Sequence, residues 1–140
     1  MLKCTLGPLA LATFITTSAA LAQTPQIKVK EPVSNGRTLS EWIMDLKALA
    51  PQTRNAAAYE IAGMGPDAVR AVPALIEALD DPSPVVRYPA TIALLEIGPA
   101  AKAAVPRLQQ MMEEEINDEI AASARRALKR IDPASVPPAD

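Results

Sequence analysis

The sequence GPDAVRAVPALIEAL, residues 65–79, decides the fold because much of it returns further along the chain. Its second copy is GPAAKAAVPRL at residues 98–108, which lies 33 positions later. The same offset takes Pro51 to Pro84. An offset of 34 then takes Pro84 to Asp118, because one residue is inserted in the turn between the two helices of the third unit. The chain is therefore built on a repeat of 33 to 34 residues that occurs three times.

Each copy of the repeat has the apolar spacing of two helices. In the first copy Leu39, Trp42, Ile43 and Leu46 recur at helical intervals, and Pro51 begins a second helix where its missing amide costs nothing. Hairpins of this length cannot bury their apolar face alone, so they stack on their neighbours. The composition, 49% hydrophobic and 3% aromatic, fits a core of small aliphatic side chains. We therefore predict an all-α fold, a short α-solenoid of three helical hairpins at residues 38–66, 71–99 and 104–133.

The second helix of repeat two, expected near residues 84–97, has two apolar sides. The side of this helix that faces away from the core carries Tyr88, Ile92 and Leu95. Pro89 lies inside this helix rather than at its start, so we expect a local kink or a delayed start. The side expected to face the core consists of Val86, Ala90, Ala93, Leu94 and Ile97.

Both ends of the chain differ from the repeats. Residues 1–22 combine Lys3, an apolar run and a final Ala20-Leu21-Ala22, which is typical of a cleavable secretory signal. The alternative is an uncleaved membrane anchor, but the run is shorter than the roughly 20 residues that a span needs. We predict a flexible leader at residues 23–37 and a disordered tail at residues 134–140. The expected location is the periplasm or the exterior, without membrane insertion once the signal is removed.

The residue types exclude much of enzyme chemistry. The chain has no histidine, and its single cysteine, Cys4, lies in the predicted signal. The usual general base, thiol nucleophile and nitrogen or sulfur metal ligands are therefore missing, and we expect no catalytic residue, no metal and no cofactor. The formal net charge of −2 is spread along the chain, which argues against nucleic acid as a partner. A small-molecule ligand is not expected either.

Charged residues form two patterns. Residues 113–115 are three glutamates, followed by Asp118 and Glu119. A Ca²⁺ site is one interpretation, but the turn glycine of a calcium loop is missing, so we favour carboxylates that stabilise the first turn of the last helix. Arg54 and Arg87 occupy equivalent positions in repeats one and two. We predict that they form a structural ladder with nearby carboxylates, the alternative being a row of anion-binding arginines.

The units share the motifs Gly-Pro-x-Ala-x-x-Ala-Val-Pro-x-Leu, Asp-Pro-x-Pro-x-Val-Arg and Ala-Leu-Leu-Glu-Ile-Gly-Pro. Over residues 38–133 this pattern resembles the bacterial HEAT-like repeats named after the phycobilisome lyases. The resemblance implies a HEAT-like fold, which scaffolds, lyase subunits and hydroxylases all use. The similar deoxyhypusine hydroxylases hold di-iron on His-Glu motifs, and a chain without histidine does not have those motifs.

The resemblance also implies that the second helices line the concave surface of the solenoid. A candidate protein-binding patch there consists of Tyr59, Tyr88, Ile92, Leu95 and Arg126. Tyrosine and arginine around aliphatic side chains is the composition typical of energetic centres in interfaces. The alternative is that Ile92 and Leu95 are simply buried between neighbouring helices.

The sequence thus predicts an exported, non-catalytic protein-binding or scaffolding module whose partner is another protein. Two alternatives stay open. One is an accessory subunit of a lyase-type enzyme or another enzyme of the cell envelope. The other is a purely structural protein that oligomerises.

Overall fold

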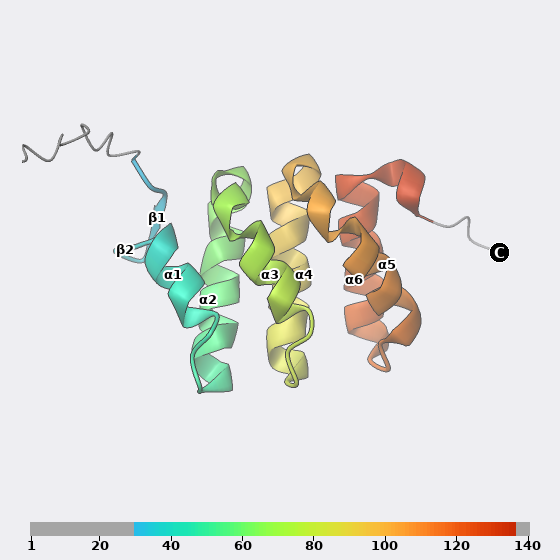
Figure 1. Cartoon of the computed structure of the whole chain (residues 1–140), viewed down its shortest axis with the longest axis horizontal. Helices are drawn as coiled ribbons and strands as arrows, with labels where there is room; N and C mark the ends of the chain where they lie inside the picture. Colours follow the sequence, from blue (N-terminus) through green and yellow to red (C-terminus); the bar gives the residue numbers. More distant parts are fainter. Residues whose placement is uncertain (1–29, 137–140) are drawn as a thin grey trace, which may run out of the picture.

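The computed structural model describes residues 30–136 of the chain (Figure 1). The expected signal peptide and residues 23–29 of the expected leader lie outside the described residues. The described elements are β1 (Val33–Ser34), β2 (Arg37–Thr38), α1 (Leu39–Asp45), α2 (Pro51–Met64), η1 (Gly65–Ala71), α3 (Val72–Ala78), α4 (Pro84–Ile97), η2 (Gly98–Ala104), α5 (Val105–Glu114), α6 (Asp118–Ile131) and η3 (Pro133–Ser135).

The six helices form two layers. Helices α1, α3 and α5 lie in one layer, and α2, α4 and α6 lie side by side in the other (Figure 1). Each hairpin pairs one helix of each layer, and α4 packs between α2 and α6. The prediction of an all-α solenoid of three helical hairpins is therefore confirmed.

Proline and glycine set the bounds of the helices in the second layer. Pro51 and Pro84 are the first residues of α2 and α4. Gly65 and Gly98 end these helices with φ of 57° and 73°, in the left-handed region that favours glycine. Because a proline follows each glycine, the chain turns at once into a short 3₁₀ segment that leads to the next hairpin.

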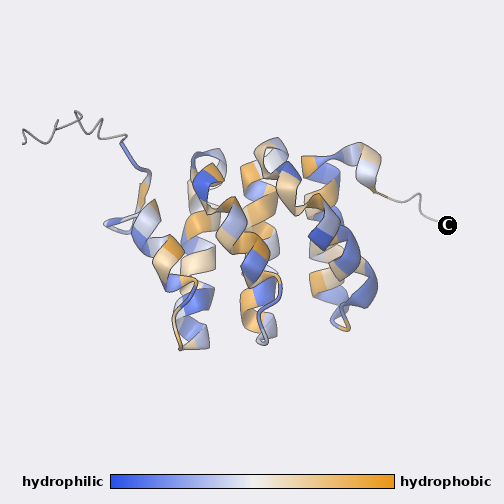
Figure 2. Ribbon diagram, in the orientation of Figure 1, coloured by the Kyte–Doolittle hydropathy of each residue, from blue (hydrophilic) through white to orange (hydrophobic). Residues whose placement is uncertain are grey.

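Small side chains allow the second-layer helices to approach closely. Buried alanines recur along them, and the whole predicted core face of α4 is buried, which confirms that prediction. Figure 2 shows hydrophobic residues along α3 and α4 of the middle hairpin, whereas α5 and α6 carry more hydrophilic residues. The last repeat thus has the polar outer face that a terminal repeat needs. The buried alanines of the second layer are Ala57, Ala58, Ala62, Ala90, Ala93, Ala124 and Ala127.

Helix α4 continues through Pro89 without interruption. It begins at Pro84, so the predicted delayed start is wrong. Pro89 has no amide to donate to the carbonyl of Val85, four residues earlier. That carbonyl instead accepts a hydrogen bond from the side-chain amide of Asn55 on α2. The backbone acceptor freed by the proline thereby joins repeat one to repeat two.

The expected flexible leader is corrected by an ordered hairpin at the N-terminal end of the array. Asn35 and Gly36, with φ of 54° and 76°, form the two-residue turn that joins β1 to β2. A pair of strands this short needs outside support. The indole of Trp42 provides it by donating to the Ser34 carbonyl (3.1 Å), and the Ser34 hydroxyl donates to Glu60 of α2 (2.6 Å).

The expected disordered tail is corrected in the same way at its start. Residues Pro133–Ser135 form η3, and the side-chain amide of Gln109 donates to the Ser135 carbonyl (2.8 Å). Val136 is partly buried against the core. Apolar contact and this hydrogen bond therefore hold the chain against α5 as far as residue 136, and residues 137–140 lie outside the described part.

Candidate functional site

The first feature that joins repeats is an ion pair between Arg54 of α2 and Asp81, which follows α3. The guanidinium donates to both carboxylate oxygens, at 2.6 and 2.9 Å. It also donates to the carbonyls of Ala48 and Leu49, at 2.8 and 2.9 Å. The side chains of Arg54 and Asp81 are only 13% and 7% exposed, so this is a nearly buried bridge rather than a surface contact.

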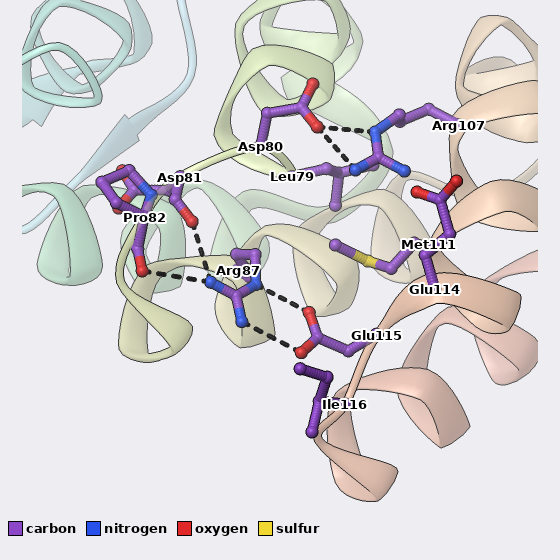
Figure 3. A pocket seen from close by; sticks show the side chains of 10 residues that line it. All are labelled: Leu79, Asp80, Asp81, Pro82, Arg87, Arg107, Met111, Glu114, Glu115 and Ile116. Atoms are coloured by element: carbon purple, nitrogen blue, oxygen red, sulfur yellow. Dashed lines mark hydrogen bonds and ion pairs between the residues drawn. The ribbon is translucent and has the colours of Figure 1, made fainter.

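Arg87 repeats this arrangement one unit later. It donates to both oxygens of Glu115, at 2.7 and 3.0 Å, and to the carbonyls of Asp81 and Pro82, at 2.9 and 3.3 Å (Figure 3). Each arginine thus reaches forward to a carboxylate of the next repeat. The predicted structural ladder is confirmed, because both arginines are held by carboxylates and do not form a free anion-binding row.

The ladder shifts the ionisation of its acids. Hydrogen bonds from Arg87 lower the pKa of Glu115 below its ordinary value of 4.5. Burial raises the pKa of Asp81, but hydrogen bonds from Arg54 and from the Ser83 amide outweigh it and leave that pKa below 3.8. Both carboxylates are therefore ionised at neutral pH, and each faces a cation.

A hollow of about 370 Å³ lies beside the second ladder pair (Figure 3). Its walls include Arg107, which bonds Asp80 at 2.6 Å, and the Arg87–Glu115 pair. Each of its two guanidiniums is thus already paired with a carboxylate of the chain, but Nη1 of Arg107 is buried and has no hydrogen-bond partner among the described residues. We interpret the hollow as a gap between repeats whose polar groups hold the repeats together.

Two tyrosines of the candidate patch share a second hollow, of about 320 Å³. Tyr59 comes from α2 and Tyr88 from α4, so the hollow spans the junction of two repeats. Tyr59 is 48% exposed and Val85, in the same wall, is 53% exposed. Asn117 at the start of α6 completes the opposite rim.

The other three residues of the candidate patch lie elsewhere. Ile92 and Leu95 are partly buried and pack against the core, and neither lines a described hollow. Arg126 is exposed and lines a third hollow, on the last hairpin. The structure therefore brings the two tyrosines together but leaves the arginine in a separate place, and docking at these residues stays a prediction.

Sequence reasoning missed Asn55 as the residue that completes the junction of repeats one and two. Its side chain is the hydrogen-bond partner of the carbonyl that Pro89 leaves free. A proline inside a predicted helix always frees the carbonyl four residues earlier, so a polar residue on the neighbouring helix was the signal to look for. Asn55 also lines the tyrosine hollow, so this junction and the candidate surface are one region.

The described part of the chain has neither a cluster of metal-binding side chains nor a helix that could span a membrane. Among residues 30–136 no three carboxylate, cysteine or histidine side chains converge on a point that a metal ion could occupy. Over the same residues, each helix is too short or too polar to cross a bilayer. Asp118 and Glu119 lie in the first turn of α6, and Lys129 and Arg130 lie in its last turn, as the dipole interpretation predicts.

The stacked hairpins and their ladder agree with a comparison against protein families. The model of HEAT repeats matches residues 40–129, which is more than half of the chain. The chain belongs to the HEAT repeat family. HEAT repeats commonly mediate protein–protein interaction, and the family is generally non-catalytic. A HEAT repeat hairpin supplies a surface whose specificity depends on a few side chains, so function has to be argued from those side chains.

Solved structures support the same fold for these HEAT repeats. The crystal structure of an engineered protein superposes with a TM-score of 0.60 at 22% sequence identity. The match covers 68% of this chain and 45% of the engineered protein, so the chain spans less than half of the length of that protein. At this level of identity the likeness concerns the fold alone. A comparison with curated proteins finds none that matches the sequence.

Proposed function

We propose that this HEAT repeat protein is a non-catalytic scaffold that binds another protein on the face formed by α2, α4 and α6. The observation that carries the proposal is the pairing of Tyr59 and Tyr88 from successive repeats in one hollow. Tyrosine combines a large apolar ring with a hydroxyl at low cost in side-chain entropy, which is why it is frequent in binding surfaces. Hydrogen bonds join the two repeats that wall the hollow, from Asn55 to the Val85 carbonyl and from Arg54 to Asp81.

The walls of the hollow indicate what kind of segment fits. Val85 and the tyrosine rings offer apolar contact, while Asn117 and Glu119 offer polar groups at the far rim. A partner segment with one apolar side chain flanked by a hydrogen-bond donor therefore matches the hollow best. Few charges are involved, so we expect this contact to depend only weakly on salt.

The test places a photo-crosslinking amino acid at position 59 or 88 of the full chain, in the cells that produce it. The matched control carries the same amino acid at Lys102, an exposed residue of η2. We expect positions 59 and 88 to capture the same protein and position 102 not to capture it. Equal capture from all three positions would contradict a specific site. Capture of only a second copy of the chain would support the oligomeric alternative.

A second measurement separates docking from packing. The variant Tyr59→Ala should abolish capture and leave the melting temperature nearly unchanged, because Tyr59 is half exposed, whereas Tyr88 packs partly against the core and is left in place. A large loss of stability with intact capture would mean that Tyr59 belongs to the core and that the partner binds elsewhere.

We also propose that the scaffold acts outside the cytoplasm. The support is the N-terminal sequence alone: Lys3, an apolar run and Ala20-Leu21-Ala22. The relation to the phycobilisome-lyase type of repeat rests on the shared motifs, and an accessory role beside an envelope enzyme is the function that this type would imply. Mass spectrometry of the secreted or periplasmic protein checks the first point, and a mature form that still contains Phe14 would rule out the proposed cleavage.

A further inference from the structure

The C-terminal hairpin carries a group of cations without partners. Arg125, Arg126 and Lys129 are exposed on α6, and none of them forms an ion pair with a carboxylate of residues 30–136. Arg125 and Lys129 are four residues apart, so they lie on one row of the helix, and Arg126 lies beside that row. The whole chain has a net charge of −2, so this face has the opposite sign from the protein as a whole.

Two of these cations, Arg125 and Arg126, border a hollow of about 470 Å³ between α5 and α6. Met112, Ala121 and Ala122 form its apolar part, and Arg125 and Arg126 line it as well. A flexible thioether beside small side chains adapts to different apolar groups. The hollow therefore offers room for an apolar side chain next to two guanidiniums.

The hollow is the place where a further repeat would stack. Met112 occupies in repeat three the position of Leu79 in repeat two, 33 residues earlier, and Arg125 occupies the position of Thr91, 34 residues earlier. Leu79 and Thr91 are completely buried, and Thr91 is hydrogen-bonded to Ser123 of α6. The face that is covered by a neighbour in repeat two is thus left uncovered by residues 30–136 in repeat three and is lined with arginine.

A second copy of the chain does not fit this face. Forward stacking depends on an arginine that reaches an acid of the next repeat, but repeat three has Ala121 at the arginine position and repeat one has Ala48 at the acid position. The N-terminal end is also covered, because the β1–β2 hairpin packs on α2 through the Ser34–Glu60 contact. Head-to-tail assembly of two copies would therefore lack the arginine–carboxylate bond of the ladder, and the β1–β2 hairpin would stand in the way of the second copy.

We propose that this end face binds an acidic helical segment of a partner protein, with carboxylates four residues apart and an apolar side chain between them. Carboxylates at that spacing match the row of Arg125 and Lys129, and the apolar side chain enters the hollow beside Met112. Guanidiniums favour carboxylates because their planar fork of N–H groups donates to both carboxylate oxygens. The face lies apart from the tyrosine hollow, so the inference goes beyond the proposed function and stands or falls separately.

The test measures binding of a fluorescent helical peptide to the full chain by anisotropy at low salt. The probe is an alanine-based peptide of about 20 residues, long enough to be helical, with one leucine between glutamates four residues apart. A peptide with glutamine in place of each glutamate is the control for shape. We expect the glutamate peptide to bind and the glutamine peptide not to bind. Equal binding of the two peptides, or no binding of either, would overturn the proposal.

Variants then locate the site. Arg125→Gln with Lys129→Gln should weaken binding about tenfold, the loss expected from two exposed ion pairs. Lys47→Gln with Lys102→Gln removes the same charge from other surfaces and should change nothing. Melting curves check folding, and Lys129→Gln alone serves if the double variant unfolds. An equal loss in both double variants would mean that only net charge matters, which overturns the proposal.

A membrane surface is the competing source of anionic groups. Vesicles of phosphatidylglycerol and phosphatidylcholine in equal parts are added to the same assay. If they bind the chain more tightly than the peptide does, and lose binding in the Arg125 and Lys129 variant, the face recognises lipid and the proposal of an acidic helix is wrong. Weaker binding to vesicles than to the peptide supports it.

Discussion

Replacement of Arg87 by methionine tests the ladder most directly. Methionine keeps much of the side-chain volume but removes the guanidinium, which donates two hydrogen bonds to Glu115 and two to the carbonyls of Asp81 and Pro82. Glu115 would then be a carboxylate that is 8% exposed and faces no cation, with the Asn117 amide at 3.2 Å as a remaining donor. The folded state is destabilised because the carboxylate stays desolvated without its counter-charge.

The size of the loss follows from burial. Removal of one partner from a fully buried pair costs about 3 to 5 kcal/mol, but Arg87 is 19% exposed, so water offsets part of it and we expect about 2 to 3 kcal/mol. For a domain of this size that corresponds to a melting temperature lower by about 10 °C. The matched control is the exposed pair of Lys47 and Glu77, each 65% exposed, where Lys47→Met should cost less than about 1 kcal/mol.

Urea unfolding followed by circular dichroism measures these free energies. A double-mutant cycle with Glu115→Gln isolates the interaction: Arg87→Met in the Glu115→Gln background should cost about 1 to 2 kcal/mol less than in the parent. Additive losses, or an Arg87→Met variant no less stable than Lys47→Met, would show that the pair does not join the repeats energetically and would refute the reasoning.

Two further predictions concern acid and the proline junction. Folding lowers the pKa values of Asp81 and Glu115, so the folded state binds fewer protons than the unfolded state. Urea titrations should therefore show the free energy of unfolding falling from about pH 5 downward, and less steeply in an Arg87→Met variant. A free energy of unfolding that rises as the pH falls would contradict this. Asn55→Ala should cost about 1 kcal/mol by leaving the carbonyl freed by Pro89 without its partner, and less in a Pro89→Ala background, where the new amide takes that carbonyl. Equal costs in the two backgrounds, measured by thermal unfolding, would mean that Asn55 acts in another way.

The period of the repeat was enough to predict most of the fold. Proline at the start of α2 and α4 and glycine at their ends follow from backbone sterics, so local residues sufficed to place these bounds. The ordered hairpin could not be predicted from the sequence, because its two short strands are stabilised by Trp42 of α1 and Glu60 of α2. Both residues lie outside the hairpin. The sequence indicated a turn at Asn35-Gly36, but it did not indicate what the flanking strands would pack against.

The candidate site was less predictable than the fold. Equivalent positions identified Arg54 and Arg87 as ladder residues, but the choice of Glu115 over its neighbours depends on where α5 ends. Spacing placed Tyr59 and Tyr88 one repeat apart, and stacking brings such positions together. Arg126 lies in another hollow. It corresponds to Ile92, about one helical turn beyond Tyr88, and a helical wheel does not show position along the helix axis.

The direction of the ladder limits which repeat can be copied. Repeat two alone carries both halves of the bond, with Asp81 accepting from behind and Arg87 reaching ahead. A gene in which residues 71–103 were duplicated would gain one complete pair with each copy and leave no charge alone at a junction. Duplication of the first or the last unit would instead set Ala48 or Ala121 at an internal junction. The middle hairpin is therefore the part from which longer arrays of this kind can grow, and the outer two are suited only to the ends.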